Sequence, residues 1–355
     1  MTFDYNITIP AHYNIYTGNY KRELRVDFSI PENDKGEITG ILLLVPGFGA
    51  TIDSNVYKKM REKFSDDYNV VALQCEYFGS KYMQTAEKVM GKKDSNDKEL
   101  ANQEMEQASK DLKRQIPVNI NGPFKAKIDE TIEDFNDMGY MQAIDLVTAI
   151  EVVKTILKEN QIVYNETRVI GYGHSHGAYL LHLSNRLVPN LFSYIIDNSA
   201  WIEPIYLTYN RYLNQRINNT IVNVEFDYLA KKIIKEKKNL NLNIIYKYYK
   251  PSTQIICFQG DNDLLVAYTD KEKLIATLKN AEFVLVKKEN IDNEKYYSNS
   301  HGLAADFLKL FDYAMTFEQP ISKVEERNVQ YKVKFGSIMF EVDYSNGLPI
   351  FLCIK

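Results

Sequence analysis

The chain has 355 residues, 45% of them hydrophobic and 25% charged, and a formal net charge of -4 at pH 7. No basic block dominates, which argues against a nucleic-acid surface, and no segment reaches the roughly 18 consecutive apolar residues of a membrane span. The first residues lack a secretory signal pattern, so we expect a soluble, cytoplasmic protein. The length is that of one large α/β domain with insertions or of two domains.

The first 75 residues predict four strands and a helix. Phe3–Ile9 and Leu24–Ile30 alternate apolar and polar side chains, as half-buried strands do. Ile41–Val45 is continuously apolar, which is typical of a strand buried on both faces, and Asn69–Cys75 is another candidate for a buried strand. Tyr57–Phe64 between them predicts a short helix.

Residues 76–132 are polar and predict an insertion. Their charged block, Lys92–Lys113, predicts a solvated helix, followed by a loop through Pro117 and Pro123. The helical period then returns from Met138 to Ile156, which predicts an amphipathic helix against the core.

The second half alternates strands and helices around another insertion, residues 201–250, which holds seven tyrosines and the single tryptophan. The predicted elements of this second half are strands Val169–Ile170, Leu191–Ile196, Thr253–Phe258 and Glu282–Val286, and helices Ala178–Leu187, Lys271–Leu278 and Leu303–Phe317. We assign residues 1–317 to one domain. The tail, 318–355, alternates and carries the hairpin signal Asn346-Gly347, so we expect an antiparallel three-stranded appendage.

The segment Thr167–Leu181, TRVIGYGHSHGAYLL, contains the pattern G-x-S-x-G centred on Ser175. A β-branched strand precedes it and a helix follows, so the pattern predicts a sharp strand-to-helix turn that exposes a nucleophilic serine. Gly173 and Gly177 would be required because a Cβ at either position would collide across the turn.

A serine nucleophile needs a base, and the chain has five histidines. His12 precedes the sheet, His174 and His176 flank the serine within the turn, and His182 lies about two helical turns further on. His301, in the loop after the last predicted strand, is therefore the candidate base.

The acid that orients the base is expected between Ser175 and His301 in the chain. Two aspartates of the loop after Phe258 compete, and we favour Asp263, since the apolar residues Leu264–Val266 should pack its loop under the sheet. Asp261 is interpreted as a turn residue that bonds local amides, and Asp197 is a third candidate.

An oxyanion site needs two backbone amides aimed at one point. The amide of His176 is expected to supply one. The other should come from the turn Gly47-Phe48-Gly49 after the third strand, most simply from Phe48.

Four motifs carry a family resemblance: PGFGA, GYGHSHGA, GDNDLLV and SHGL. Over residues 38–316 the chain resembles the α/β-hydrolase superfamily. The resemblance implies an eight-stranded, mostly parallel sheet with helices on both faces, and its G-x-x-D-x-x-V pattern places the acid at Asp263. The chain departs from the superfamily in its two long insertions and in Pro46-Gly47, where HG often opens the oxyanion turn.

We therefore expect a serine hydrolase with no metal or other cofactor, acting on a carboxylic ester of a small molecule or on an O-acyl group of a glycan. The alternatives are a peptidase or thioesterase with the same residues, and a non-catalytic binding protein on a hydrolase scaffold. Residues 201–250 are expected to form a cap whose tyrosines line the pocket, or else to pack on the back of the sheet.

Overall fold

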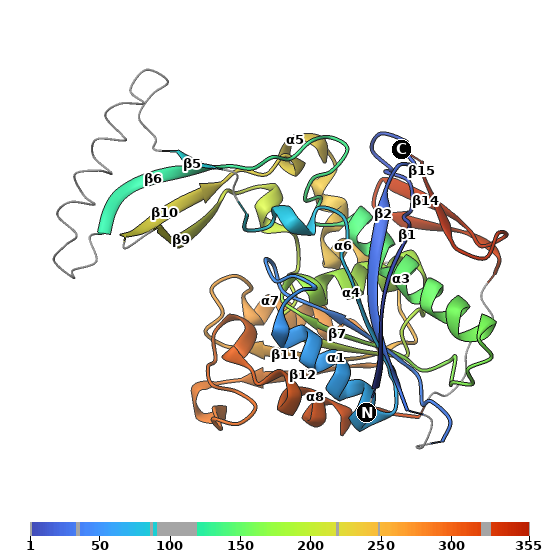
Figure 1. Cartoon of the computed structure of the whole chain (residues 1–355). Coiled ribbons are helices and arrows are strands. Elements are labelled where there is room, and N and C mark those ends of the chain that lie inside the picture. Colours follow the sequence, from blue (N-terminus) through green and yellow to red (C-terminus); the bar gives the residue numbers. More distant parts are fainter. Residues whose placement is uncertain are drawn as a thin grey trace.

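The computed structural model describes residues 2–32, 36–85, 88–90, 119–217, 220–247, 249–320 and 328–354, with the backbone alone for 88–90, 119–123, 215–217 and 220. A central sheet of eight strands has the order β1-β2-β4-β3-β7-β8-β11-β12 (Figure 1). Only β2 runs antiparallel to both of its neighbours. The predicted eight-stranded, mostly parallel sheet is confirmed. Its strands are β1 (Thr2–Pro10), β2 (Glu23–Pro31), β3 (Ile41–Val45), β4 (Val71–Cys75), β7 (Val169–His174), β8 (Tyr194–Asn198), β11 (Gln254–Gly260) and β12 (Ala281–Val286).

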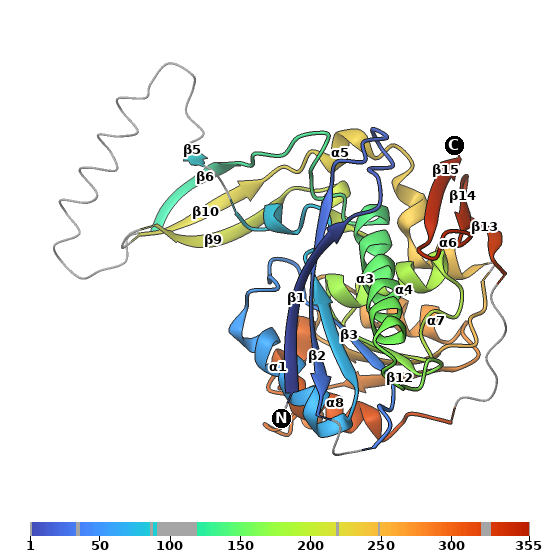
Figure 2. The ribbon, with the colours of Figure 1, turned by 45° about the vertical axis from the view of Figure 1, so that its right-hand side comes forward.

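Both faces of this sheet are covered, because successive side chains of a strand point to opposite faces. In β3, Ile41, Leu43 and Val45 join a hydrophobic cluster with α3 and α4. Leu42 and Leu44 join a second cluster with α1 and α8. Figure 2 shows α1 and α8 on one side of the sheet and α3 and α4 on the other. The longer helices are α1 (Asn55–Tyr68), α3 (Tyr140–Glu159), α4 (His176–Leu187), α7 (Tyr268–Ile275) and α8 (Phe307–Met315).

The two insertions together build a second sheet, which the sequence did not predict. Its order is β5-β6-β10-β9, with β5 and β6 from the first insertion and β9 and β10 from the second. Figures 1 and 2 both show it extending away from the main sheet. The strands are β5 (Lys88–Met90), β6 (Asn119–Lys127), β9 (Arg211–Ile217) and β10 (Thr220–Phe226).

The loop predicted through Pro117 and Pro123 is wrong at Pro123, which lies inside β6, whereas Pro117 lies outside the described residues. The pairing of β6 with β10 shifts register between Val222 and Val224, next to this proline. A bulge accommodates a residue that cannot donate to the ladder, which explains why proline did not end the strand. The predicted helix Lys92–Lys113 lies outside the described residues.

The remaining short elements connect the two sheets and carry the loops around the candidate site. They are η2 (Ser80–Tyr82), η3 (Ile205–Leu207), α5 (Ala230–Ile233), η4 (Lys237–Leu240), α6 (Leu242–Lys247), η5 (Lys288–Asn290) and η6 (His301–Ala304).

The closing helix begins later than predicted, at Phe307 instead of Leu303. Gly302 and Leu303 have positive φ angles of 74° and 62°, so the chain turns there before the helix starts. The Asp306 carboxylate then caps the helix by accepting from the amides of Leu308 and Lys309.

The tail forms the predicted antiparallel sheet of three strands, β13 (Gln330–Phe335), β14 (Ile338–Asp343) and β15 (Ile350–Ile354). Phe335 and Phe340 contact Tyr140 of α3 and belong to the main hydrophobic cluster. The amide of Phe351 donates to His12 Nε2 at 2.8 Å, which ties the tail to the N-terminal segment. The division into two domains at residue 317 stays a prediction.

Over the part of the chain that the structure describes, no helix combines the length and apolar character needed to cross a membrane.

Candidate active site

Ser175 occupies the turn between β7 and α4. Its φ of 53° and ψ of -117° lie in a sparsely populated region for a residue with a side chain. The turn can form because the residues two positions before and after Ser175 are glycines, which lack a Cβ. A Cβ on Gly173 would lie 2.4 Å from Ala178 Cα, and one on Gly177 would lie 2.2 Å from Val45 O. The sequence-based explanation of these two glycines is confirmed.

His301 contacts the serine. It lies at the start of η6, and its Nε2 is 2.6 Å from Ser175 Oγ. The loop is anchored directly behind it, because the Gly302 amide donates to Ser199 Oγ at 3.1 Å. The His301 side chain is 20% exposed, so the pair is reachable from solvent while remaining fixed.

Asp263 completes a chain of hydrogen bonds. Its Oδ2 lies 2.7 Å from His301 Nδ1, and its side chain is fully buried. Burial acts to raise the pKa of this carboxyl, but the hydrogen bond and charge of His301 and two backbone amides outweigh burial and hold the pKa below its usual value. The ionised carboxylate accepts, so Nδ1 carries the proton and the lone pair of Nε2 faces the serine hydroxyl.

The residues that orient Asp263 differ from those expected. Leu264 is 94% exposed and Leu265 is 40% exposed, so these two side chains do not pack under the sheet. The predicted packing of Leu264 and Leu265 is wrong. The carboxylate is instead held by the amides of Leu265 and Val266, at 2.8 and 3.0 Å, and by Gln259 Nε2 at 2.6 Å. Gln259 was missed, although its position at the end of β11 points to this edge of the sheet.

The competing aspartates lie elsewhere. Asp261 accepts from Asn299 Nδ2 at 2.7 Å and so braces the loop that leads to His301, where we had expected it to bond local amides. Asp197 is buried and paired with Lys271 and His182. The structure brings neither of them to His301.

The two candidate oxyanion amides lie where the turn after β3 meets the serine turn. The contact is close, because the space beside Gly177 is filled by the carbonyl oxygens of Val45 and Pro46. Within the described residues, the amides of Phe48 and His176 have no hydrogen-bond acceptor. Neither amide is therefore committed to an acceptor in that part of the chain.

The rings of His174 and His176 contact residues other than Ser175, in agreement with the expectation that they leave the turn in other directions. His176 Nε2 lies 2.7 Å from Gln142 Oε1, and its ring is fully buried. Burial, with the nearby charge of Arg211, lowers the pKa of His176 to about 3, so its ring is neutral. The ring of His174 stacks edge-on against Phe307.

Phe48 is the centre of an aromatic cluster formed largely by the second insertion. Its ring centroid lies 5.3–5.7 Å from the rings of His176, Trp201, Tyr206 and Tyr228. The beginning of the insertion therefore lies next to the serine turn.

The end of the insertion lies at the far end of α4. Tyr246 Oη is 2.6 Å from His182 Nδ1, and Tyr249 Oη donates to Asn185 O at 3.0 Å. The insertion thus touches both the serine turn and the back of α4. A cap over the site stays a prediction.

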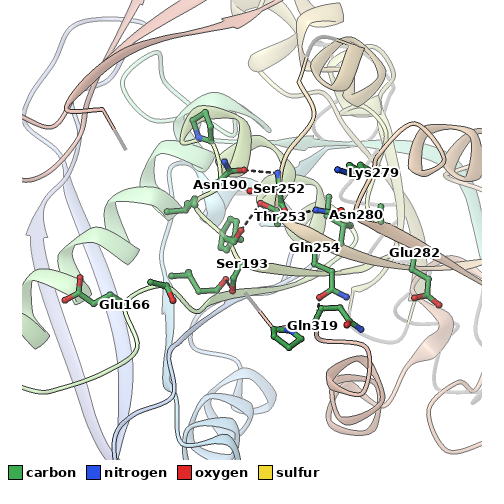
Figure 3. A pocket seen from close by; sticks show the side chains of 18 of the residues that line it. Glu166, Asn190, Ser193, Ser252, Thr253, Gln254, Lys279, Asn280, Glu282 and Gln319 are labelled. Atoms are coloured by element: carbon green, nitrogen blue, oxygen red, sulfur yellow. Dashed lines mark hydrogen bonds between the residues drawn. The ribbon is translucent and has the colours of Figure 1, made fainter. Parts of the chain in front are cut away.

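A cavity of about 960 Å³ lies at the opposite edge of the main sheet (Figure 3). It is lined at the amino ends of the strands, for example by Val169 of β7, Gln254 of β11 and Ala281 of β12. Ser175, Asp263 and His301 follow the carboxyl ends of strands, so this cavity is no part of their site. Among the described side chains, no group of three or more histidine, cysteine, aspartate or glutamate residues is placed to hold a metal ion.

Comparison with known families and structures gives the following. A family model described as a protein of unknown function (DUF2920) matches residues 17–275, which is more than half of the chain. A search of curated proteins found no match.

Three solved structures illustrate the structural likeness. The acylaminoacyl peptidase of Pyrococcus horikoshii is 13% identical with a TM-score of 0.51, over 92% of this chain and 43% of that one. A putative dipeptidyl aminopeptidase IV from Bacteroides ovatus is 13% identical with a TM-score of 0.53, over 90% and 36%. Est1E from Butyrivibrio proteoclasticus, with ferulic acid bound, is 11% identical with a TM-score of 0.45, over 83% and 94%. The chain spans less than half the length of the two peptidases. At these identities the likeness shows the fold, and the α/β-hydrolase fold inferred from the motifs is confirmed.

Proposed function

The chain belongs to the family described as protein of unknown function (DUF2920) and has the α/β-hydrolase fold, and we propose that it is a serine hydrolase that cleaves carboxylic esters. The observation that carries the proposal is the continuous chain from Ser175 Oγ to His301 Nε2, at 2.6 Å, and from His301 Nδ1 to Asp263 Oδ2, at 2.7 Å.

In the proposed reaction, Ser175 Oγ attacks the carbonyl carbon while its proton passes to His301 Nε2. Asp263 stabilises the imidazolium that forms, and the amides of Phe48 and His176 bind the developing oxyanion. His301 then returns the proton to the leaving alcohol oxygen. Water attacks the acyl-enzyme with the same histidine as base, which releases the acid and regenerates the serine.

An ester is proposed as the bond because it makes the smallest demand on these groups. An alcohol leaves more readily than an amine, so ester cleavage depends less than amide cleavage on the proton that His301 donates. The carbonyl oxygen would be placed at the two amides that have no acceptor among the described residues.

The test is a panel of p-nitrophenyl esters of rising acyl length, run beside acetylated sugars, a matched p-nitroanilide and a matched thioester. We expect turnover of at least one ester, unchanged by a chelator. We also expect Ser175→Ala to lower kcat by at least about 10⁴-fold, since nucleophile removal in serine hydrolases costs up to roughly 10⁶-fold. Faster cleavage of the anilide or thioester would replace the ester by that bond. A Ser175→Ala variant as active as the wild type would refute the proposal.

A further inference from the structure

Arg211 places a positive charge beside the candidate oxyanion turn. It is the first residue of β9, in the second insertion. Its guanidinium carbon lies 4.6 Å from the centroid of the Phe48 ring and 5.5 Å from that of Tyr206. Phe48 carries one of the two proposed oxyanion amides, so the cation packs on the ring of a residue whose amide would bind the oxyanion.

The direction of this side chain follows from strand geometry. The neighbours of Arg211, Asn210 and Tyr212, both bond the Glu225 carboxylate across the hairpin. Since adjacent side chains of a strand point to opposite faces, Arg211 faces the other way, toward Phe48. The Glu225 carboxylate therefore lies on the opposite face of the hairpin and does not neutralise the Arg211 guanidinium.

Among the residues that the structure describes, no carboxylate matches the charge of Arg211. One guanidinium nitrogen donates to Met83 O at 3.0 Å, and Tyr228 Oη donates to the same carbonyl at 2.6 Å. Among the described residues, no carboxylate oxygen lies within 4.0 Å of the guanidinium. A guanidinium has five N–H donors arranged in a planar fork that suits a carboxylate, and this side chain is only partly buried.

We propose that Arg211 binds a second carboxylate on the acyl part of the substrate, so that the enzyme prefers half-esters of short dicarboxylic acids. The acyl part is chosen because Arg211 packs on the ring of Phe48, whose amide is proposed to bind the carbonyl oxygen, and that oxygen belongs to the acyl group. This inference rests on the proposed serine hydrolase function. Two N–H donors paired with one carboxylate give both affinity and orientation.

The test compares two aryl esters of equal acyl length, the p-nitrophenyl half-ester of succinate and p-nitrophenyl levulinate, which replaces the free carboxylate by a neutral methyl ketone. The rate with Ser175→Ala is subtracted as background. We expect wild-type kcat/KM to be at least about 10-fold higher for the charged ester. We expect Arg211→Met to lower it about 100-fold for the charged ester, mainly through KM, and less than about 3-fold for the neutral one.

Two variants complete the design. Arg211→Lys keeps the charge but loses the fork, so an intermediate loss is expected with the charged ester. Lys232→Met is the matched control, since it removes a positive charge from an exposed position of the same insertion. We expect it to change both rates by less than about 3-fold. Should Arg211→Met fold poorly, the wild type suffices: glutarate should slow fluorophosphonate labelling of Ser175 more than its neutral diamide does.

The outcomes separate the two levels of the proposal. Equal rates of the wild type with both esters, or equal losses with both esters in Arg211→Met, would overturn the carboxylate site and leave Arg211 as a support for Phe48. In that case hydrolysis and labelling of Ser175 would persist. Absence of both hydrolysis and labelling would overturn the serine hydrolase function and this inference together.

Discussion

The described part of the chain contains two histidine–aspartate pairs with similar hydrogen bonds and different surroundings. In the first, His301 Nδ1 meets Asp263 at 2.7 Å and Nε2 meets the Ser175 hydroxyl at 2.6 Å. In the second, His182 Nε2 meets Asp197 at 3.1 Å and Nδ1 meets the hydroxyl of Tyr246 at 2.6 Å. Each imidazole therefore lies between a carboxylate and a hydroxyl group.

The difference lies in access and in charge balance. The side chain of His301 is 20% exposed, whereas the side chains of His182 and Asp197 are 1% and 0% exposed. Asp197 also pairs with the fully buried ammonium of Lys271, at 2.9 Å. Burial acts to raise the pKa of Asp197, but Lys271 and His182 bring it well below its usual value.

The comparison teaches that a histidine–aspartate pair by itself does not define an active site. The second pair joins α4, β8, α7 and the end of the second insertion, so its charges stabilise their arrangement. The first pair keeps one ring nitrogen next to a hydroxyl that a substrate could reach. Changes in the first should therefore alter rate, and changes in the second should alter stability.

The largest effect is expected at the acid of the first pair. Asp263→Asn offers a donor where His301 Nδ1 needs an acceptor, so we expect kcat to fall about 10⁴-fold, or about 5 kcal/mol, as in serine proteases with this change. Asp261→Asn should lower kcat less than about tenfold, because Asp261 only braces Asn299. Ester hydrolysis by both variants, with thermal melts to establish folding, measures this. An inactive, folded Asp261→Asn beside an active Asp263→Asn would reverse the assignment.

A smaller effect, on stability alone, is expected at the second pair. Lys271→Met leaves the Asp197 carboxylate buried without its ammonium partner, which typically costs 3–5 kcal/mol. Urea unfolding should show a loss of about that size, with kcat per folded molecule within about threefold of wild type.

Lys273→Met is the matched control on the same helix. The Lys273 side chain is 78% exposed and pairs with Asp270 on the surface, so the expected loss is under about 1 kcal/mol. Equal losses in the two variants would show that the buried network does not support the fold as described.

The smallest effect concerns pH. Burial lowers the pKa of His182 below its usual 6.5, and Asp197 offsets this only in part. Below pH 6.5 the unfolded chain takes up a proton there that the folded chain does not. The stability that the buried, neutral His182 permits is therefore complete above pH 6.5. It is lost as the pH falls toward the pKa of His182 in the folded protein.

His182→Gln removes the part of the pH dependence of stability that arises at His182. The slope of unfolding free energy against pH between 6.5 and 5 should become shallower by up to about 1.4 kcal/mol per pH unit. It should not vanish, since burial also lowers the pKa of His12 and His176, to about 4 and 3. Urea titrations at pH 7.5, 6.5, 5.5 and 5.0 measure the slopes. Parallel slopes for the variant and the wild type would contradict this role.

The parts that the sequence predicted well are those set by local patterns. Continuous apolar runs marked the central strands, and Gly173 and Gly177 marked the turn at Ser175 because backbone contacts leave no room for a Cβ. The chain order of serine, acid and base also led to His301 and Asp263, which the structure places in one hydrogen-bonded chain. Their catalytic roles stay a proposal.

The parts that the sequence did not predict depend on contacts distant in the chain. Strands β6 and β10 come from different insertions and pair only in the folded molecule. Gln259 and Arg211 are ordinary polar residues in their own segments, and only the fold brings them to Asp263 and Phe48. The packing role given to Leu264 failed because a hydrogen-bonded turn, not side-chain burial, orients the neighbouring carboxylate.

The central claim is that Ser175 is a nucleophile activated by His301. The most direct measurement is the intact mass and peptide map of the folded protein after reaction with a fluorophosphonate. The account predicts one adduct, on Ser175, which is absent in Ser175→Ala and strongly slowed in His301→Ala. No adduct on the folded wild-type protein, or an adduct on another residue with Ser175 unmodified, would contradict it.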